Sequence, residues 1–286
     1  MDTALLAWDE TVTLDGLRFH YRDWGDPAAP PLVLLHGFTG NAHQWDTFAR
    51  TMTDRYRVLA LDQRGHGETG WPPDQGYSAA RVREDFIAFV ATLRLERLAV
   101  VGFSFGCEVA YGYAVMHPAQ VSRLVLVEPG DPPDTPAVWA ATAAFRALPT
   151  VFDSPDAAVT SFASAGLAPA APADELRHWV LSGLTSQPAG RWSWRVDPVL
   201  LHPDPQGRER LTHGREVMWR LLPQVACPTL LVRGAASAHT PVDDVTRMVA
   251  VMSDARAVSV PHAGHWVPLD NPDSFARLVR NFLAGG

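Results

Sequence analysis

Short apolar runs recur along the chain and constrain its fold more than any other feature of the sequence. They are PLVLLH (31–36), YRVLALD (56–62), LAVVGF (98–103), VSRLVLVEP (121–129), PTLLVRG (228–234) and ARAVSVP (255–261). Runs of this length without polar alternation are typical of strands that are buried on both faces of a parallel sheet. Helical patterns separate several of them, so the sequence predicts an α/β fold with a doubly wound, mostly parallel sheet and right-handed crossovers.

Further segments complete this predicted core. Residues 10–14 and 17–24, joined by Asp15-Gly16, predict a β-hairpin near the start of the chain. Apolar residues recur at helical spacing in 81–95, and another helix is expected over 274–283. Counted from the hairpin, the run at 121–129 is the sixth strand.

The segment 130–226 interrupts the alternation of strands and helices. It opens with GDPPDTP and contains no convincing strand. Helical patterns lie around 137–148, 156–165, 173–184 and 208–222. We therefore expect a helical cap, inserted after the sixth strand, over a core formed by 1–129 and 227–286.

Composition narrows the class of partner. The 286 residues are 47% hydrophobic and 19% charged, with a mean hydropathy of −0.05, which is typical of a globular protein. The formal charge is −7, and no stretch concentrates the basic residues, all of which are arginine. Nucleic acid is therefore not expected as a partner.

The sequence also bears on location. No run of 18 apolar residues predicts a membrane span, and the acidic N-terminus MDTALLAWDETV does not resemble a secretory signal. Cys107 and Cys227 are too few for a disulfide framework. We therefore expect a cytoplasmic protein with no membrane span.

The stretch VVGFSFGCEV (100–109) places Ser104 between Gly102 and Gly106, directly after an apolar run and directly before a helical pattern. A serine in a sharp strand-to-helix turn takes a strained backbone, and the residues two positions to either side must approach closely, which glycine permits. The same turn directs the N–H groups and dipole of the following helix at the serine. In this setting Gly-x-Ser-x-Gly indicates a nucleophile elbow, with Ser104 as the candidate nucleophile.

Four motifs, in this order, carry a resemblance to a known family: HGFTG (36–40), DQRGHG (62–67), GFSFG (102–106) and AGHW (263–266). With them the chain resembles α/β-hydrolases that have a helical cap. The resemblance covers the core, whereas 130–226 matches only in position and helical character. It implies the α/β-hydrolase fold and a serine hydrolase. A serine at the elbow argues against relatives that need an aspartate there, such as haloalkane dehalogenases and epoxide hydrolases.

The resemblance implies that His265 is the catalytic base, because it follows the last predicted strand and gives the chain order serine, acid, histidine. His262, three residues earlier, is the alternative base. The two histidines also have the spacing of a metal-ligand pair, but no third or fourth ligand with suitable spacing lies nearby. We therefore expect neither a metal nor another cofactor.

Two strands compete to supply the acid. Many family members carry an aspartate shortly after the strand written here as PTLLVRG, but this chain continues AASAHTP and has no carboxylate before Asp243. Other cap-bearing members carry the acid after the preceding strand, where this chain has Glu128. That edge of an open α/β sheet is where catalytic groups gather. We predict Glu128 as the acid. The alternatives are Asp243, Asp244 and Asp131.

The resemblance also implies how an oxyanion would be held. One backbone N–H would come from Phe105, directly after the nucleophile, and the other from Phe38, after the His36-Gly37 pair. His265 would take the Ser104 proton while the carboxylate orients the imidazole. An acyl-enzyme would form and then be hydrolysed by water.

Aromatic residues lie close to these motifs. Phe103 and Trp266, with Trp139 of the cap, are predicted to line the substrate pocket, although burial between cap and core explains Trp139 equally well. We therefore expect a small-molecule partner, an apolar ester or ketone, and carboxylesterase-like activity. The alternatives are C–C bond hydrolysis of a diketone-like substrate, or a ligand receptor or lyase on the same fold.

Overall fold

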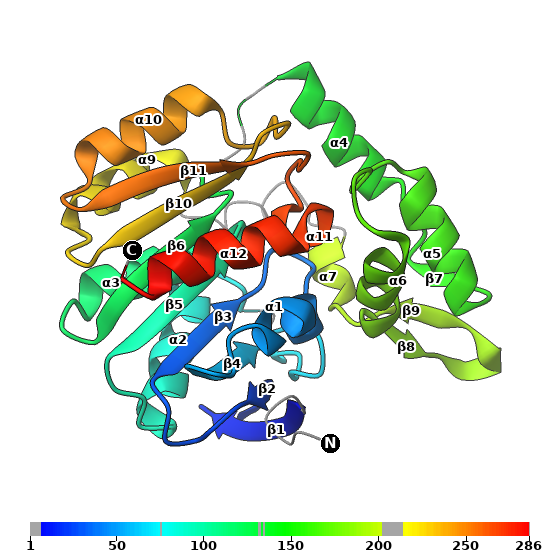
Figure 1. The fold of residues 1–286 in the computed structure, drawn as a ribbon. Helices are drawn as coiled ribbons and strands as arrows, with labels where there is room; N and C mark the ends of the chain where they lie inside the picture. The colour runs from blue at the N-terminus through cyan, green and yellow to red at the C-terminus, as the bar shows by residue number, and fades with distance from the viewer. Residues whose placement is uncertain (1–6, 75, 131–132, 134, 202–213, 286) are drawn as a thin grey trace.

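An eight-stranded sheet forms the centre of the protein in the computed structural model, which describes residues 7–74, 76–130, 133, 135–201 and 214–285. The strand order is β1-β2-β4-β3-β5-β6-β10-β11 (Figure 1). The strands are β1 (Ala7–Leu14), β2 (Leu17–Trp24), β3 (Pro31–Leu35), β4 (Arg57–Leu61), β5 (Leu98–Phe103), β6 (Val121–Val127), β10 (Thr229–Gly234) and β11 (Ala255–Val260). The pairs β1–β2 and β2–β4 are antiparallel, and the remaining neighbours are parallel. The predicted hairpin and mostly parallel sheet are confirmed.

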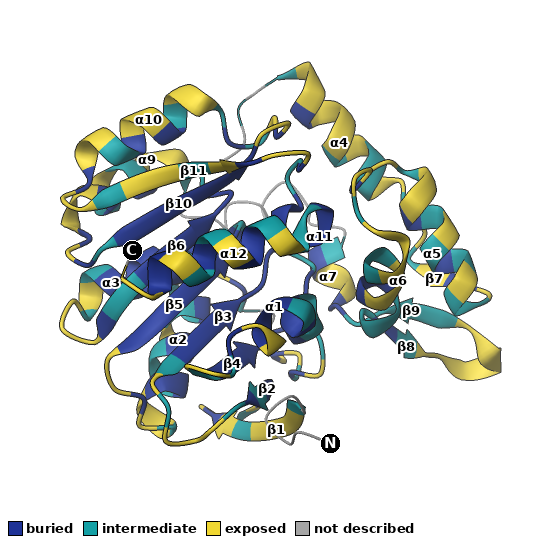
Figure 2. Ribbon diagram, viewed as in Figure 1, coloured by how far each residue is buried: buried dark blue, intermediate teal, exposed yellow. Residues whose placement is uncertain are grey.

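Helices cover both faces of the sheet. Successive strand residues point to opposite faces, so Leu32 and Leu34 of β3 join one apolar cluster while Val33 and Leu35 join the other. The first cluster includes residues of α1 (Asp46–Arg50) and α12 (Pro272–Leu283); the second includes residues of α2 (Ala79–Thr92), α3 (Phe105–Met116), α9 (Gly214–Leu221) and α10 (Val242–Val251). The central strands are therefore buried along most of their length (Figure 2).

The segment between β6 and β10 contains helices near the positions expected for a cap, together with short strands. They are α4 (Pro136–Arg146), β7 (Val151–Phe152), α5 (Pro155–Ser164), α6 (Ala173–Ser182), β8 (Leu184–Ser186), β9 (Trp192–Trp194) and α7 (Pro198–Leu201). The elements from α4 to β9 lie to one side of the sheet (Figure 1). Much of α4 is exposed, and Val138 is the one buried residue of this helix (Figure 2).

One expectation for this segment was wrong, because it does contain strands. β7, β9 and β8 form a small antiparallel sheet in which Val151 pairs with Ser193 and Leu184 with Trp194. These strands are only two or three residues long, so they show no period that separates them from a loop. Pairing with one another, rather than local preference, makes them strands.

The last helix of this segment packs with the core. Met218 and Leu222 are buried in the same apolar cluster as Val109 of α3 and Met248 of α10. In Figure 1, α9 accordingly lies beside α10 and away from α4–α6. The cap boundaries 130–226 stay a prediction, and this packing favours assigning α9 to the core.

Backbone hydrogen bonds join the cap to the loop after β4. The Gly67 N–H donates to the Arg195 carbonyl at 2.8 Å, and the Asp197 N–H donates to the Gly65 carbonyl at 2.8 Å. These contacts hold the end of β9 against the edge of the sheet at which β3, β5, β6 and β10 end. Within the described residues, no helix has the length and apolar character needed to cross a membrane.

Candidate active site

Ser104 lies in a strained turn between β5 and α3. Its φ of 50° and ψ of −114° are unusual for a residue with a side chain. A Cβ on Gly102 would come within 2.5 Å of the Gly106 carbonyl oxygen, and one on Gly106 within 2.4 Å of the Leu35 carbonyl oxygen. The two glycines are therefore required by close backbone approach, as the nucleophile-elbow interpretation predicts.

Neighbouring groups fix this turn. The Ser104 N–H donates to the Val127 carbonyl at 2.8 Å, which ties the turn to β6. Cys107 is fully buried beneath it, and its thiol donates to the Gly102 carbonyl at 3.1 Å. Burial raises the pKa of Cys107 well above its ordinary value, so this thiol stays protonated and packs rather than reacts.

The loop after β3 lies directly beside the elbow. A Cβ on Gly37 would lie 3.3 Å from the Ser104 Cβ. His36 shapes this loop from a buried position: its Nε2 accepts from the Gln63 N–H at 3.0 Å, and its Nδ1 lies 2.7 Å from the Gly37 carbonyl, to which it donates. Phe38 follows Gly37 in this loop, and Phe105 begins α3 directly after Ser104; the use of their N–H groups to hold an oxyanion stays a prediction.

Glu128 and His265 meet at the same edge of the sheet. The Nδ1 of His265 lies 3.1 Å from Oε2 of Glu128, which is 1% exposed. Glu128 directly follows β6 and has a φ of 53°. A buried carboxylate at Nδ1 selects the tautomer that leaves the Nε2 lone pair free to accept a proton.

Neutral donors satisfy the rest of the Glu128 carboxylate. The Gly234 N–H donates to Oε1 at 2.7 Å, and the Ser237 hydroxyl donates to Oε2. Ser237 lies in the loop after β10, the region where many members of the resembling family carry their acid. Besides His265, the polar partners of Glu128 in the described residues are therefore uncharged donors.

Phe103 links the histidine to the elbow. Its ring centroid lies 5.1 Å from that of His265, and it immediately precedes Ser104. Within the described ranges, Ser104 Oγ forms no hydrogen bond. Catalytic hydrogen bonds are often long without substrate and tighten when it binds.

Comparison with known proteins agrees with this geometry. The model of the family described as "alpha/beta hydrolase fold" matches residues 30–272. The chain belongs to the α/β-hydrolase fold family. It is 30% identical to 3-hydroxybutyrate-oligomer hydrolase of Cupriavidus necator, with 98% of each chain covered. The crystal structure of esterase Rv0045c from Mycobacterium tuberculosis superimposes with a TM-score of 0.75 at 28% identity, covering 98% of this chain and 92% of that one.

A closer superposition shows the fold alone. The crystal structure of E-2-(acetamidomethylene)succinate hydrolase gives a TM-score of 0.84 at 23% identity, covering 98% of this chain and all of that one. At this level of sequence identity the two proteins share their fold, but the similarity does not indicate a shared substrate.

The other carboxylates considered for this α/β-hydrolase lie elsewhere. Asp243 and Asp244 are in the first turn of α10, where Asp243 is exposed and Asp244 pairs with Arg215. Neither contacts His265 in the described structure. Asp131 lies outside the described residues. His262, the alternative base, is exposed.

Two residues near His265 were missed by sequence reasoning. The ring of His239 stacks on that of His265, with centroids 4.0 Å apart and planes inclined by 26°. Asp270 is buried and accepts from the Gly264 N–H at 2.8 Å. Burial raises the pKa of Asp270 to about 6, although that hydrogen bond opposes the rise. Both contacts depend on tertiary packing, and no sequence motif marks either residue.

The aromatic residues divide into two groups. Trp266 is buried, and its ring contacts Trp179 of α6 at 4.9 Å and Phe162 of α5 at 5.9 Å. Phe103 is 1% exposed, and its ring contacts the ring of His265. Trp139 lies on α4 with 56% of its surface exposed, so its role in a pocket stays a prediction. Trp179 and Phe162 are cap aromatics that contact Trp266, the residue directly after His265.

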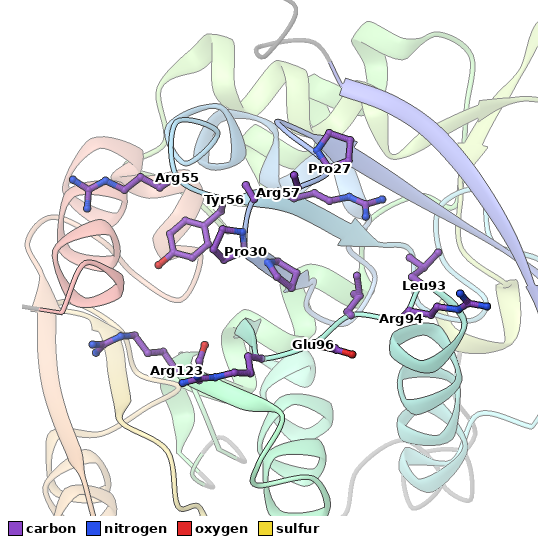
Figure 3. Close-up of a pocket in the computed structure, with 15 residues that line it drawn as sticks. Pro27, Pro30, Arg55, Tyr56, Arg57, Leu93, Arg94, Glu96 and Arg123 are labelled. Atoms are coloured by element: carbon purple, nitrogen blue, oxygen red, sulfur yellow. The ribbon is translucent and has the colours of Figure 1, made fainter.

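A cavity of about 670 Å³ lies at the opposite edge of the sheet (Figure 3). Its lining includes Pro31, Arg57 and Arg123, near the amino-terminal ends of β3, β4 and β6. Ser104 follows the carboxyl end of β5. The length of the parallel strands therefore separates this cavity from the elbow, and we assign the cavity no part in the chemistry.

One group of potential metal ligands occurs in the part of the chain that the structure describes: His43, Asp46 and His178. Asp46 Oδ2 lies 3.1 Å from His43 Nδ1 and 2.9 Å from His178 Nε2. However, the guanidinium of Arg22 binds Asp46 and lies 2.7 Å from His43 Nδ1. Arg22 thus occupies the position that a cation would take, and the group is better described as a salt-bridge network.

Proposed function

We propose that the protein hydrolyses carboxylic esters with apolar groups through a triad of Ser104, His265 and Glu128. The observation that carries this proposal is the buried Glu128 carboxylate, 3.1 Å from His265 Nδ1, at the edge of the sheet where the Ser104 elbow projects. Groups that follow β5, β6 and β11 would then form one relay, in which Glu128 orients His265 and His265 activates Ser104.

In the first step His265 Nε2 takes the Ser104 hydroxyl proton as Oγ attacks the ester carbonyl carbon. Glu128 holds Nδ1–H and stabilises the imidazolium that forms. The developing oxyanion accepts hydrogen bonds from the backbone N–H groups of Phe105 and Phe38, and the amino end of α3 favours its charge.

Collapse of this intermediate passes the proton from His265 to the leaving alcohol and leaves an acyl group on Ser104. Water then attacks the acyl-enzyme while His265 takes its proton, and the carboxylic acid is released. The same imidazole therefore acts as base and acid in both halves of the reaction.

The names of the relatives support an ester as the substrate. A diacylglycerol lipase of Mus musculus is 30% identical over 91% of this chain, and the mycobacterial relative named an esterase is 29% identical over 91%. The buried aromatics around Trp266 agree with an apolar acyl or alcohol group. C–C bond hydrolysis uses the same triad and is tested alongside.

The test combines covalent labelling with turnover. An organophosphonate ester is expected to label Ser104, located by peptide mass spectrometry, and a 4-nitrophenyl ester of a short fatty acid is expected to be hydrolysed. Ser104→Ala should abolish both. Labelling of Ser104 with cleavage of a vinylogous diketone but of no ester would reject the ester in favour of C–C hydrolysis. Absence of labelling and turnover would reject a hydrolase and favour a ligand receptor.

A further inference from the structure

The stacked pair of imidazoles at the proposed site suggests a role for His239. His239 and His265 lie 26 positions apart in the chain, yet their ring centroids are 4.0 Å apart and their planes nearly parallel. Exposed side chains rarely hold such an arrangement, because it costs rotamer freedom. His239 is only partly exposed, so the contact is part of the packed structure.

The loop that carries His239 is fixed on all sides. The buried guanidinium of Arg233 donates to the carbonyl of Thr240 at 3.0 Å and to that of Ser237 at 3.1 Å, on either side of His239. The His239 N–H donates to the Ser237 hydroxyl at 3.1 Å, and that hydroxyl donates to Glu128. The His239 ring and the acid that binds His265 therefore belong to one hydrogen-bonded unit.

A hydrogen bond to Glu128 does not by itself fix the direction of His265 Nε2. The bond at Nδ1 leaves the ring free to swing about the line that joins Nδ1 to Oε2, and this swing moves Nε2 across the elbow. A flat ring stacked on the imidazole opposes that rotation. The stack thus supplies the orientation that the carboxylate lacks, and orientation is a large part of the effect of a catalytic group.

The protonation state of His239 suits this role. Burial, with a smaller contribution from the charge of a protonated His265, lowers the pKa of His239 to about 3. His239 is therefore neutral when His265 accepts a proton, and adds no like charge beside the imidazolium. Arg233, Glu128, Ser237 and Thr240 are the polar groups around this loop, and Arg233 is directed at carbonyl oxygens rather than at the His239 ring.

We infer that His239 is a positioning residue for the proposed reaction: its ring, stacked on His265, holds Nε2 in the direction of Ser104. The inference deepens the proposed function and rests on it. His239 acts through its flat face and not through its ring nitrogens, so another aromatic ring replaces it and an aliphatic side chain of similar size does not.

The experiment compares His239→Leu with His239→Phe. Both substitutions place an apolar side chain in the loop and remove the ring nitrogens, but only phenylalanine presents a flat ring. We expect kcat for a 4-nitrophenyl ester to fall about tenfold in His239→Leu with little change in KM, and to stay within about twofold of wild type in His239→Phe. The rate of phosphonate labelling of Ser104 should follow kcat.

His117→Leu is the matched control. The His117 ring stacks on Tyr113 with the same 26° inclination and is also partly exposed, but it lies at the far end of α3. The His117→Leu substitution should leave kcat unchanged. Unchanged kcat in His239→Leu, or equal losses in the Leu and Phe variants, would overturn the role of His239 while Ser104→Ala still abolishes turnover. Turnover that survives Ser104→Ala would reject the proposed function, and the role of His239 with it.

Discussion

Three buried carboxylates, Glu128, Asp46 and Asp62, each contact a histidine in the described residues, and only Glu128 belongs to the proposed active site. Glu128 and Asp46 are both 1% exposed. Glu128 binds His265, and Asp46 lies within 3.1 Å of both His43 and His178. Counted by residue type and distance alone, the Asp46 group contains more histidines than the proposed triad.

The difference lies in what else each carboxylate binds. Asp46 pairs with Arg22, and the same guanidinium donates to the His43 Nδ1 lone pair. Burial opposes ionisation of Asp46, but the hydrogen bond from His178, the contact with His43 and, to a smaller extent, the charge of Arg22 hold its pKa below the ordinary value. Its charge is already neutralised, so it has little effect on an imidazolium.

Glu128 has no such partner among the described residues. It accepts from the Gly234 N–H and the Ser237 hydroxyl, which are neutral, so its charge acts on His265. We therefore expect Glu128, which neutral donors hold beside His265, to support an imidazole base, and Asp46, which Arg22 holds, to act as a structural group. The predictions below separate these two cases.

The largest effect is expected for Glu128→Gln. The amide keeps the shape of the carboxylate but cannot stabilise the imidazolium, so kcat should fall by about 10⁴, as in the serine-protease template. The midpoint of thermal unfolding should change little, which circular dichroism checks. Loss of activity in Asp243→Asn or Asp244→Asn, with Glu128→Gln active, would instead move the acid to α10.

Asp46→Asn should lower stability and leave kcat nearly unchanged, which is the opposite of the result expected for Glu128→Gln. Loss of the carboxylate leaves Arg22 without its buried partner, so the free energy of unfolding should fall by about 3 kcal/mol. Urea titration followed by fluorescence measures this change. The variant that remains folded at 25 °C should keep kcat within about threefold of wild type. A large loss of kcat would mean that the Asp46 group also takes part in chemistry.

Asp270 allows a test of another buried carboxyl, with a defined pH dependence. Because its pKa is raised to about 6, the folded protein keeps a proton that the unfolded chain releases near pH 4. Between pH 4 and 6 the contribution of this group therefore lowers the free energy of unfolding as pH rises. Above pH 7 this loss of stability stays constant. Asp270→Asn keeps an acceptor for the Gly264 N–H and removes this loss.

The stability gain of Asp270→Asn over wild type should accordingly grow from pH 5 to pH 7, to about 2 kcal/mol. Urea unfolding of both proteins at pH 5, 6, 7 and 8 measures it. An equal difference at all four values would show that Asp270 does not titrate in this range.

The smallest effect is expected for His178→Ala. The His178 side chain is 45% exposed, and exposed ion pairs contribute about 1 kcal/mol or less. Stability should change by no more than this, and kcat should stay the same, because Arg22 still neutralises Asp46. A loss comparable with that of Asp46→Asn would show that His178, and not Arg22, controls the Asp46 charge.

The core could be predicted from the sequence because its constraints are local. Buried strands of β3 to β6 appear as continuous apolar runs, and the elbow needs glycine at 102 and 106 for reasons of backbone geometry. Glu128 could be proposed because it follows a predicted strand, and catalytic groups gather at the carboxyl edge of a parallel sheet.

The cap and the surroundings of His265 could not be predicted in the same way. The strands β7, β8 and β9 exist only through pairing with one another, and α9 belongs with the core through long-range packing of Met218. Nothing in the sequence around His239 or Asp270 indicates that both approach His265. Such contacts form only after the chain has folded.

The central claim is that the Glu128 charge activates Ser104 through His265, whereas the Asp46 charge does not. The rate constant for phosphonate labelling of Ser104, measured by mass spectrometry in wild type, Glu128→Gln and Asp46→Asn, tests it most directly. We expect the rate constant to fall by about 10³ or more in Glu128→Gln and to change by less than about threefold in Asp46→Asn. Equal labelling rates in wild type and Glu128→Gln would contradict it.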